Sequence, residues 1–150
     1  MTGTSNVWTA MSVDEENGLA FLPVSSPSAD FYGGTRTDPI PLATSVTAVN
    51  GDTGEVVWSR QLVNHDIWDY DTVAAPTLVD IPGEGGSTPA LVQPTKMGYA
   101  FVLNRLTGEP IFPIEDTPVP ATDVEGEVSS PTQPIPTLPK SQIGDDWGGV

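Results

Sequence analysis

The sequence predicts an all-β fold, and more specifically a partial β-propeller of about three blades, some of them incomplete. Gly and Pro are frequent, at 15 and 16 of 150 residues, which suits short strands joined by turns and not long helices. Residues 48–58 and 102–112 share one scheme: a strand, a turn ending in Thr-Gly-Glu, and a second strand that ends on an aromatic residue. Residues 13–21 form a looser third copy. All-β units that recur in this way indicate a propeller, which needs ~4–8 blades to close, so we expect a fragment with open edges.

The individual elements follow from alternating or β-branched runs bounded by Gly, Pro and Asn. Asn17-Gly18 supplies a tight turn for the first hairpin, because Gly adopts positive φ at little cost. A loop over residues 25–41 is long enough to suggest a functional role. Residues 114–150 are rich in Pro and acids, and we expect an irregular, extended C-terminal tail of the same domain as residues 1–113. The expected strands are residues 7–13, 19–24, 44–49, 55–60, 75–81, 89–93, 98–103 and 109–113.

The charge of the chain excludes some classes of partner. Twenty Asp and Glu against five Lys and Arg give a formal net charge of −15 at pH 7. Such a surface repels nucleic acid and anionic membrane faces, so we expect no nucleic-acid partner and a neutral or cationic small-molecule substrate. The absence of Cys excludes disulfides and thiolate chemistry. No signal peptide is visible at the start, and we expect any export or anchoring segment to lie outside this chain.

Residues 64–71 hold the only histidine, three aspartates and two aromatic residues. A carboxylate flanked by apolar side chains can act as a general base, because such neighbours raise its pKa toward the working pH. Asp69, between the two aromatic residues, is the candidate base, with a structural turn aspartate as the alternative. Asp66 and Asp71 are expected to bind backbone amides of the loop. His65 either orients a substrate or carboxylate or is a hydrogen-bonded structural residue.

Several motifs, in order, resemble those of quinoprotein dehydrogenases, and in particular the membrane-bound glucose dehydrogenase branch. These enzymes depend on the cofactor pyrroloquinoline quinone (PQQ) and are built on an eight-bladed propeller. The resemblance extends from Trp8 to Trp147 and implies that the chain is an internal fragment of such an enzyme. The motifs are the Thr-Gly-Glu-x-x-Trp turn at residues 53–58, the His-Asp-Ile-Trp-Asp-Tyr-Asp run at 65–71, Gln-Pro-Thr-Lys-Met-Gly at 93–98, the Thr-Gly-Glu repeat at 102–110 and Ser-Pro-Thr-Gln-Pro at 130–134.

The resemblance implies roles for four residues. Asp69 matches the proposed base, and Lys96, in a bend between two expected strands, matches the lysine that contacts the quinone. A cation there would polarise the carbonyl that accepts hydride, whereas the alternative is a solubilising surface lysine. His65 and Arg36 are expected to help bind the cofactor, although an ion-paired surface role for Arg36 is equally open.

The resemblance also implies cofactors, partners and a location. PQQ is expected, with calcium or magnesium in the full-length enzyme. Ser25 and Ser26 replace a Gly-Asn pair of the family, so no metal-binding residue is assigned. The implied reaction oxidises a sugar, polyol or alcohol and passes electrons to a membrane quinone on the periplasmic side of the bacterial inner membrane. The alternatives are a non-catalytic PQQ-like propeller scaffold repeat and, more weakly, a carbohydrate-binding module.

Overall fold

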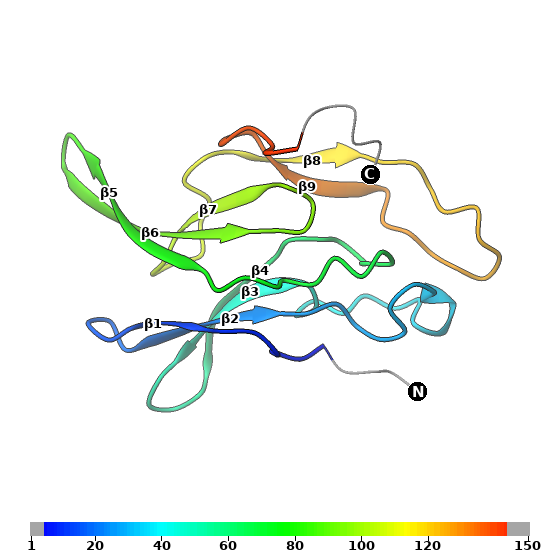
Figure 1. Ribbon diagram of the computed structural model, residues 1–150, viewed down its shortest axis with the longest axis horizontal. Coiled ribbons are helices and arrows are strands. Elements are labelled where there is room, and N and C mark those ends of the chain that lie inside the picture. The colour runs from blue at the N-terminus through cyan, green and yellow to red at the C-terminus, as the bar shows by residue number, and fades with distance from the viewer. Residues whose placement is uncertain (1–4, 144–150) are drawn as a thin grey trace.

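The computed structural model describes residues 5–143 as three antiparallel β-sheets, which follow one another from bottom to top in Figure 1. A 3₁₀ turn, η1 (Gly33–Thr35), interrupts the loop after β2. No helix of the described residues is long and apolar enough to cross a membrane. The all-β prediction is confirmed. The strands are β1 (Ser12–Asp14), β2 (Leu19–Val24), β3 (Ser45–Asn50) and β4 (Val56–Gln61) in the first sheet, β5 (Thr77–Gly83), β6 (Gly86–Pro94) and β7 (Ala100–Asn104) in the second, and β8 (Ile114–Pro118) and β9 (Thr132–Pro136) in the third.

The Thr-Gly-Glu repeat is the clearest link between sequence and structure. In the β3–β4 turn the Asn50 carbonyl accepts a hydrogen bond from the Gly54 amide at 2.8 Å, and in the turn after β7 Asn104 and Gly108 do the same at 2.8 Å. The Oδ1 atom of each asparagine also accepts two turn amides. Both glycines have positive φ, +75° and +74°, which L-residues with a side chain rarely adopt. The same local chemistry therefore builds the same turn in two successive sheets.

The first two sheets pack against each other at this second turn. A Cβ atom on Gly108 would stand only 2.7 Å from the Trp58 ring of β4. The Trp58 Nε1–H donates to the Arg105 carbonyl at 3.1 Å. Only glycine fits beneath the indole, so the repeat fixes the position of one sheet on the next. Apolar side chains of both sheets form one core, which includes Phe21, Val46, Ala48, Leu91, Phe101 and Leu103.

Arg105 also joins the two sheets through charge. Its Nε donates to Asp14 Oδ2 at 2.7 Å, and its Nη1 donates to Asp80 Oδ1 at 2.8 Å and to the Val79 carbonyl at 2.9 Å. The side chains of Asp14 and Arg105 are 6% and 12% exposed. Burial alone would raise the pKa of Asp14, but hydrogen bonds from Asn17 and Arg105 outweigh it and lower the pKa.

Replacing Arg105 by Met in the full-length protein should destabilise it by about 1–3 kcal/mol, because the buried Asp14 carboxylate loses its charged donor. A fall of several degrees in the thermal unfolding midpoint would show this. Arg60→Met is the matched control: its pair with Glu109 is 4.0 Å long, its bonds to the Gly108 carbonyl are 3.2 and 3.4 Å long, and its side chain is 35% exposed. Its loss should therefore cost less than about 1 kcal/mol. Equal shifts for the two variants would contradict the role given to Arg105.

Two expected strands differ in the structure. Residues 7–13 were predicted as one strand, but β1 is only Ser12–Asp14, because the preceding residues bond to loops: the Asn6 carbonyl accepts from the Ser25 amide, and the Thr9 hydroxyl donates to the Val73 carbonyl. Residues 109–113 were also predicted as a strand. They form only an isolated bridge between Leu103 and Pro110, since proline has no N–H to donate to a ladder.

The prediction of an irregular C-terminal tail is wrong for part of the segment. β8 and β9 pair in an antiparallel register from Ile114 with Pro136 to Pro118 with Thr132. The buried Gln133 side chain fixes β9 to the loop that follows β4. Its Oε1 accepts from the Asn64 amide and its Nε2 donates to the Asn64 carbonyl, both at 2.8 Å. The long connection over residues 119–131, termed the β8–β9 loop, carries the remaining irregular backbone. The division between residues 1–113 and 114–150 stays a prediction.

Candidate functional site

The loop that follows β4 is shaped by one buried carboxylate. Asp66 is 2% exposed and accepts hydrogen bonds from the Trp68 and Tyr70 amides and the Thr44 hydroxyl, each at 2.9 Å. Burial raises the pKa of Asp66, and these hydrogen bonds offset part of the rise. The expectation that Asp66 binds backbone amides is therefore confirmed.

Two residues of this loop have left-handed backbone. His65 has φ of +46° and Asp69 has φ of +58°. Asp is among the residues that tolerate this conformation, whereas strained backbone persists only where surrounding contacts enforce it. The hydrogen bonds that Asp66 accepts from the amides of Trp68 and Tyr70, on either side of Asp69, are such contacts, and they hold the backbone of Asp69 in place.

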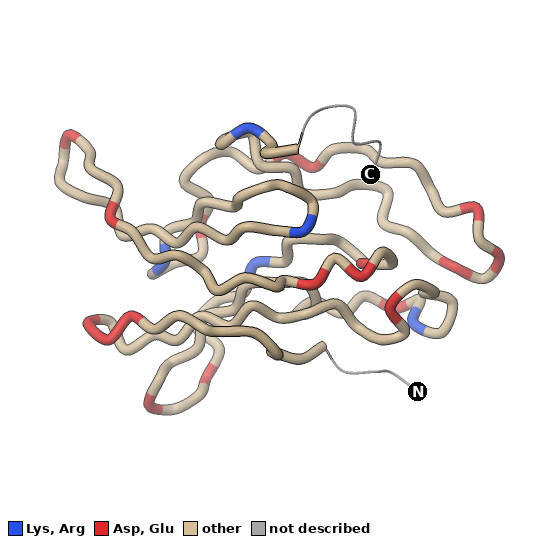
Figure 2. Tube along the Cα trace, viewed as in Figure 1, with Lys and Arg blue, Asp and Glu red and all other residues tan. Residues whose placement is uncertain are grey.

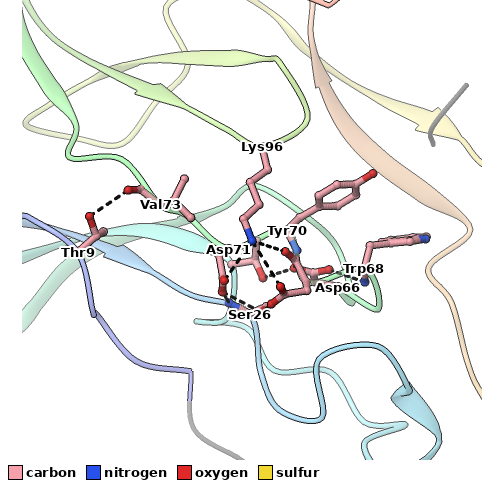
Figure 3. Close-up of polar contacts among 10 residues, drawn as sticks. Thr9, Ser26, Asp66, Trp68, Tyr70, Asp71, Val73 and Lys96 are labelled. Carbon is pink, nitrogen blue, oxygen red and sulfur yellow. Dashed lines mark hydrogen bonds and ion pairs between the residues drawn. The ribbon is translucent and has the colours of Figure 1, made fainter. Parts of the chain in front are cut away.

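Lys96 reaches this loop from the bend between β6 and β7 (Figure 3). Its Nζ donates to the Asp69 carbonyl at 2.8 Å and lies 3.4 Å from Asp69 Oδ2 and 3.2 Å from Asp71 Oδ2. The sequence placed Asp69 and Lys96 27 positions apart, and the structure brings them into direct contact. Asp69, Asp71 and Lys96 thus form one charged cluster.

Ser26 completes the cluster from the opposite side. Its hydroxyl donates to Asp69 Oδ1 at 2.9 Å or to Asp71 Oδ1 at 3.0 Å, and its amide donates to Asp71 Oδ1 at 3.0 Å. Asp71 therefore binds a backbone amide, as expected. Its ion pair with Lys96 and the part played by Ser26 were not foreseen from the sequence, because the three segments meet only in the tertiary structure.

The charges within the cluster stabilise one another. Burial alone would raise the pKa of Asp71, but hydrogen bonds from Ser26 and Lys96 lower it. Burial alone would likewise lower the pKa of Lys96, but the hydrogen bond and negative charge of Asp71, followed by those of Asp69, raise it. Near neutral pH the pair is fully charged, and Lys96 remains 34% exposed toward the open side of the site.

The other two predicted cofactor residues lie elsewhere. Arg36, 4% exposed, donates from Nε and Nη2 to the Ala29 carbonyl at 3.3 and 3.0 Å. The Nε2 atom of His65 is buried without a hydrogen-bond partner among residues 5–143, and burial followed by the charge of Arg36 lowers the pKa of His65. His65 lines a cavity of about 330 Å³ beside the β8–β9 loop. No hydrogen bond of the described residues joins either side chain to Asp69 or Lys96, so their role in cofactor binding stays a prediction.

Trp8 is an aromatic residue near the cluster that the sequence did not single out. Its side chain is 56% exposed. The backbone around it is held beside the cluster by the Asn6–Ser25 and Thr9–Val73 hydrogen bonds. The signal in the sequence was weak, since exposed tryptophans also occur on ordinary surfaces.

The donor set of the cluster suits hard cations and anionic oxygens. Asp69 and Asp71 offer carboxylate oxygens and Ser26 a hydroxyl oxygen, which are ligands of the type that calcium and magnesium prefer. Within the described residues, no group of three or more His, Cys, Asp and Glu side chains is placed to hold a metal. The set therefore fits such an ion in kind and supplies only part of its ligands. Lys96 adds an ammonium group to the cluster, which suits anionic oxygens.

The three sheets and the docking of Trp58 on the next repeat turn define the chain as part of a β-propeller. Residues 1–146 match the PQQ family described as "Glucose/ethanol/alcohol dehydrogenase, beta-propeller domain". The chain belongs to this family. The expected resemblance to PQQ-dependent quinoprotein dehydrogenases is confirmed.

Curated relatives are much longer than this chain. It is 42% identical to the glycerol dehydrogenase large subunit of Gluconobacter thailandicus over 97% of this chain and 21% of the relative. It is 41% identical to the quinoprotein glucose dehydrogenase of Gluconobacter oxydans (strain 621H), over 97% and 19%. A quinate/shikimate dehydrogenase (quinone) of Acinetobacter baylyi is 40% identical, over 98% and 19%. The chain spans about a fifth of the length of these relatives.

A solved structure agrees with the fold. The quinohemoprotein alcohol dehydrogenase ADHIIG from Pseudomonas putida HK5 superposes with a TM-score of 0.66 at 28% identity, over 89% of this chain and 20% of that chain. The chain therefore matches one part of a larger protein with the same fold.

Proposed function

We propose that the full-length protein is a PQQ-dependent dehydrogenase that oxidises a sugar, polyol or alcohol, and that this chain carries one side of its active site. The contact between Lys96 and Asp69 is the observation that carries the proposal. It places a partly exposed cation beside a carboxylate whose direction is fixed by strained backbone and by Ser26. A propeller that serves only as a scaffold has no need of such a pair.

In this proposal Asp69 is the general base. Its side chain is 28% exposed, and its carboxylate would take the proton of the substrate hydroxyl as the carbon–hydrogen bond breaks. Ser26 and Lys96 hold the carboxylate in place, and Asp66 fixes the loop that carries it. Lys96 would place its positive charge beside the quinone oxygen that becomes negative.

Bound PQQ would supply the quinone that accepts the hydride. Trp8, whose chain neighbours bond to Ser25 and Val73, would offer its exposed indole as a flat apolar face to such a ring. Asp71 and Ser26 would contribute oxygen ligands to a calcium or magnesium ion, Asp69 would be kept as the base, and the remaining ligands would come from outside the described residues. His65 and Arg36 keep their proposed role at the edge of the cofactor site.

The test is activity and cofactor binding of the full-length protein. After addition of PQQ with calcium or magnesium, it should reduce an artificial electron acceptor when glucose, glycerol or a simple alcohol is supplied. Saturable PQQ binding followed by fluorescence should accompany this activity. Absence of both binding and turnover would favour the non-catalytic scaffold repeat instead.

We further propose that the electrons pass to a membrane quinone on the periplasmic side of the bacterial inner membrane. Support comes from the word "quinone" in the name of the Acinetobacter baylyi relative. Reduction of a short-chain ubiquinone by the purified full-length enzyme would test the acceptor. An acidic surface that repels nucleic acid agrees with a small-molecule enzyme.

A further inference from the structure

A second cavity, of about 380 Å³, lies between the Asp69 loop and the β8–β9 loop. Its volume is within the range of sites that bind small molecules. Trp68 forms part of its lining, and Figure 3 shows the Trp68 ring pointing away from Lys96. Ile67 and Trp68, the two residues that precede Asp69, line the cavity, so it borders the loop that carries Asp69.

The outer wall of this cavity is held in place by Glu127. Its Oε1 accepts from the Gly33 amide and its Oε2 accepts from the Thr122 hydroxyl, both at 2.7 Å. The Gly33 hydrogen bond is the main reason that the pKa of Glu127 is lowered. A Cβ on Gly33 would stand 2.8 Å from the Ile67 Cγ2 atom and 3.3 Å from the Glu127 Cγ atom. The β8–β9 loop, η1 and the Asp69 loop are thus closely packed at one point, and the cavity has fixed walls.

The lining of the cavity has a definite chemistry. Phe31, which is 76% exposed, and Trp68 provide flat apolar faces. The Thr122 hydroxyl and the Asp123 carboxylate provide acceptors for hydroxyl groups. No Lys, Arg or His of residues 5–143 lines it, and Figure 2 shows acidic residues along the neighbouring β8–β9 loop.

These features select among small molecules. A ring with several hydroxyl groups can place its apolar face on an aromatic side chain and donate its hydroxyl hydrogens to a carboxylate. A ligand that carries a carboxylate would instead meet Asp123 and Glu127 in a lining to which no Lys, Arg or His of the described residues contributes. The lining therefore suits a neutral polyol and disfavours an acid such as quinate.

We propose that this cavity is a subsite for a neutral, ring-shaped polyol, such as a pyranose sugar, next to the reacting centre. The proposal rests on the proposed dehydrogenase function and assigns its substrate class. It gives Phe31 and Asp123 a role in choosing the substrate. Neither residue has a part in the chemical step.

The test uses the full-length enzyme with glucose and with glycerol, which has no ring to place on an aromatic side chain. Phe31→Ala and Asp123→Ala should each raise KM for glucose by about three- to tenfold, as the loss of one such contact does, with kcat unchanged. KM for glycerol should stay the same. Val56→Ala, which removes an exposed apolar side chain on β4, is the matched control and should change neither value.

Several results would overturn the proposal. KM for glucose that is unchanged in both variants would show that the cavity does not bind substrate or is filled by another part of the full-length protein. Equal use of quinate and glucose, or calorimetric binding of choline in place of glucose, would show that the ligand class is wrong. Calorimetry of glucose on cofactor-free protein separates the two proposals. Weaker glucose binding in Phe31→Ala than in wild type, together with no turnover by wild type supplied with PQQ and metal, would support the subsite and contradict the dehydrogenase function.

Discussion

Replacing Asp69 by Asn in the full-length protein should lower kcat by about 10²–10⁴-fold, the usual contribution of a general base. Asn is the appropriate substitution because it tolerates the left-handed backbone at this position, where φ is +58°. Its side-chain oxygen can still accept the Ser26 hydroxyl, and the backbone carbonyl can still accept Lys96. Steady-state kinetics with an artificial electron acceptor would measure the fall.

PQQ binding distinguishes a lost base from a damaged site. The dissociation constant of the cofactor should change by less than about threefold in Asp69→Asn. Asp71→Asn is the matched control, since Asp71 also contacts Ser26 and Lys96 but is given no proton to take. Its kcat should fall by less than about tenfold. A kcat for Asp69→Asn within tenfold of wild type, or an equal loss in both variants, would remove Asp69 from the role of base.

Local chemistry explains why much of the fold could be predicted. The β1–β2 and β3–β4 hairpins depend on turns of four or five residues, and the residue types that make those turns are visible in the sequence. The Thr-Gly-Glu repeat also carries its own hydrogen bonds. By contrast, β8 and β9 contain prolines, which weaken a strand prediction. Their pairing is stabilised by contacts far away in the chain, such as the Gln133–Asn64 bonds.

Only part of the candidate site could likewise be predicted from the sequence. The sequence grouped the aspartates of the Asp69 loop because they are neighbours, and the family resemblance added Lys96. Nothing local indicated that Ser26, more than 40 positions earlier, would bind both Asp69 and Asp71. The same holds for Glu127, which is 94 positions from Gly33. Side chains that meet from distant segments require the structure.

Replacing Lys96 by Met should lower kcat/KM by about 10²–10³-fold, the effect of removing one donor to developing negative charge. PQQ affinity should fall as well, because the ammonium is the positive group at the open side of the cluster. Lys96→Arg keeps the charge and should recover part of both losses. Turnover in Lys96→Met close to that of wild type would contradict a contact between Lys96 and the quinone.

A pH series of thermal unfolding separates this role from a purely structural ion pair. Asp71 has a folded pKa below its ordinary 3.8, so its contribution to stability is present above that value and is lost as pH falls through the lowered pKa. Lys96 has a folded pKa above its ordinary 10.5, so its contribution is present below that value and is lost as pH rises through the raised pKa. The stability difference between wild type and Lys96→Met should therefore be constant from about pH 4 to about pH 10 and remain under about 1 kcal/mol for so exposed a pair. A lysine that acts on the bound cofactor should give a large loss of turnover between about pH 4 and about pH 10 with only this small loss of stability. Proportionate losses of turnover and stability would instead assign Lys96 to the structure of the loop alone.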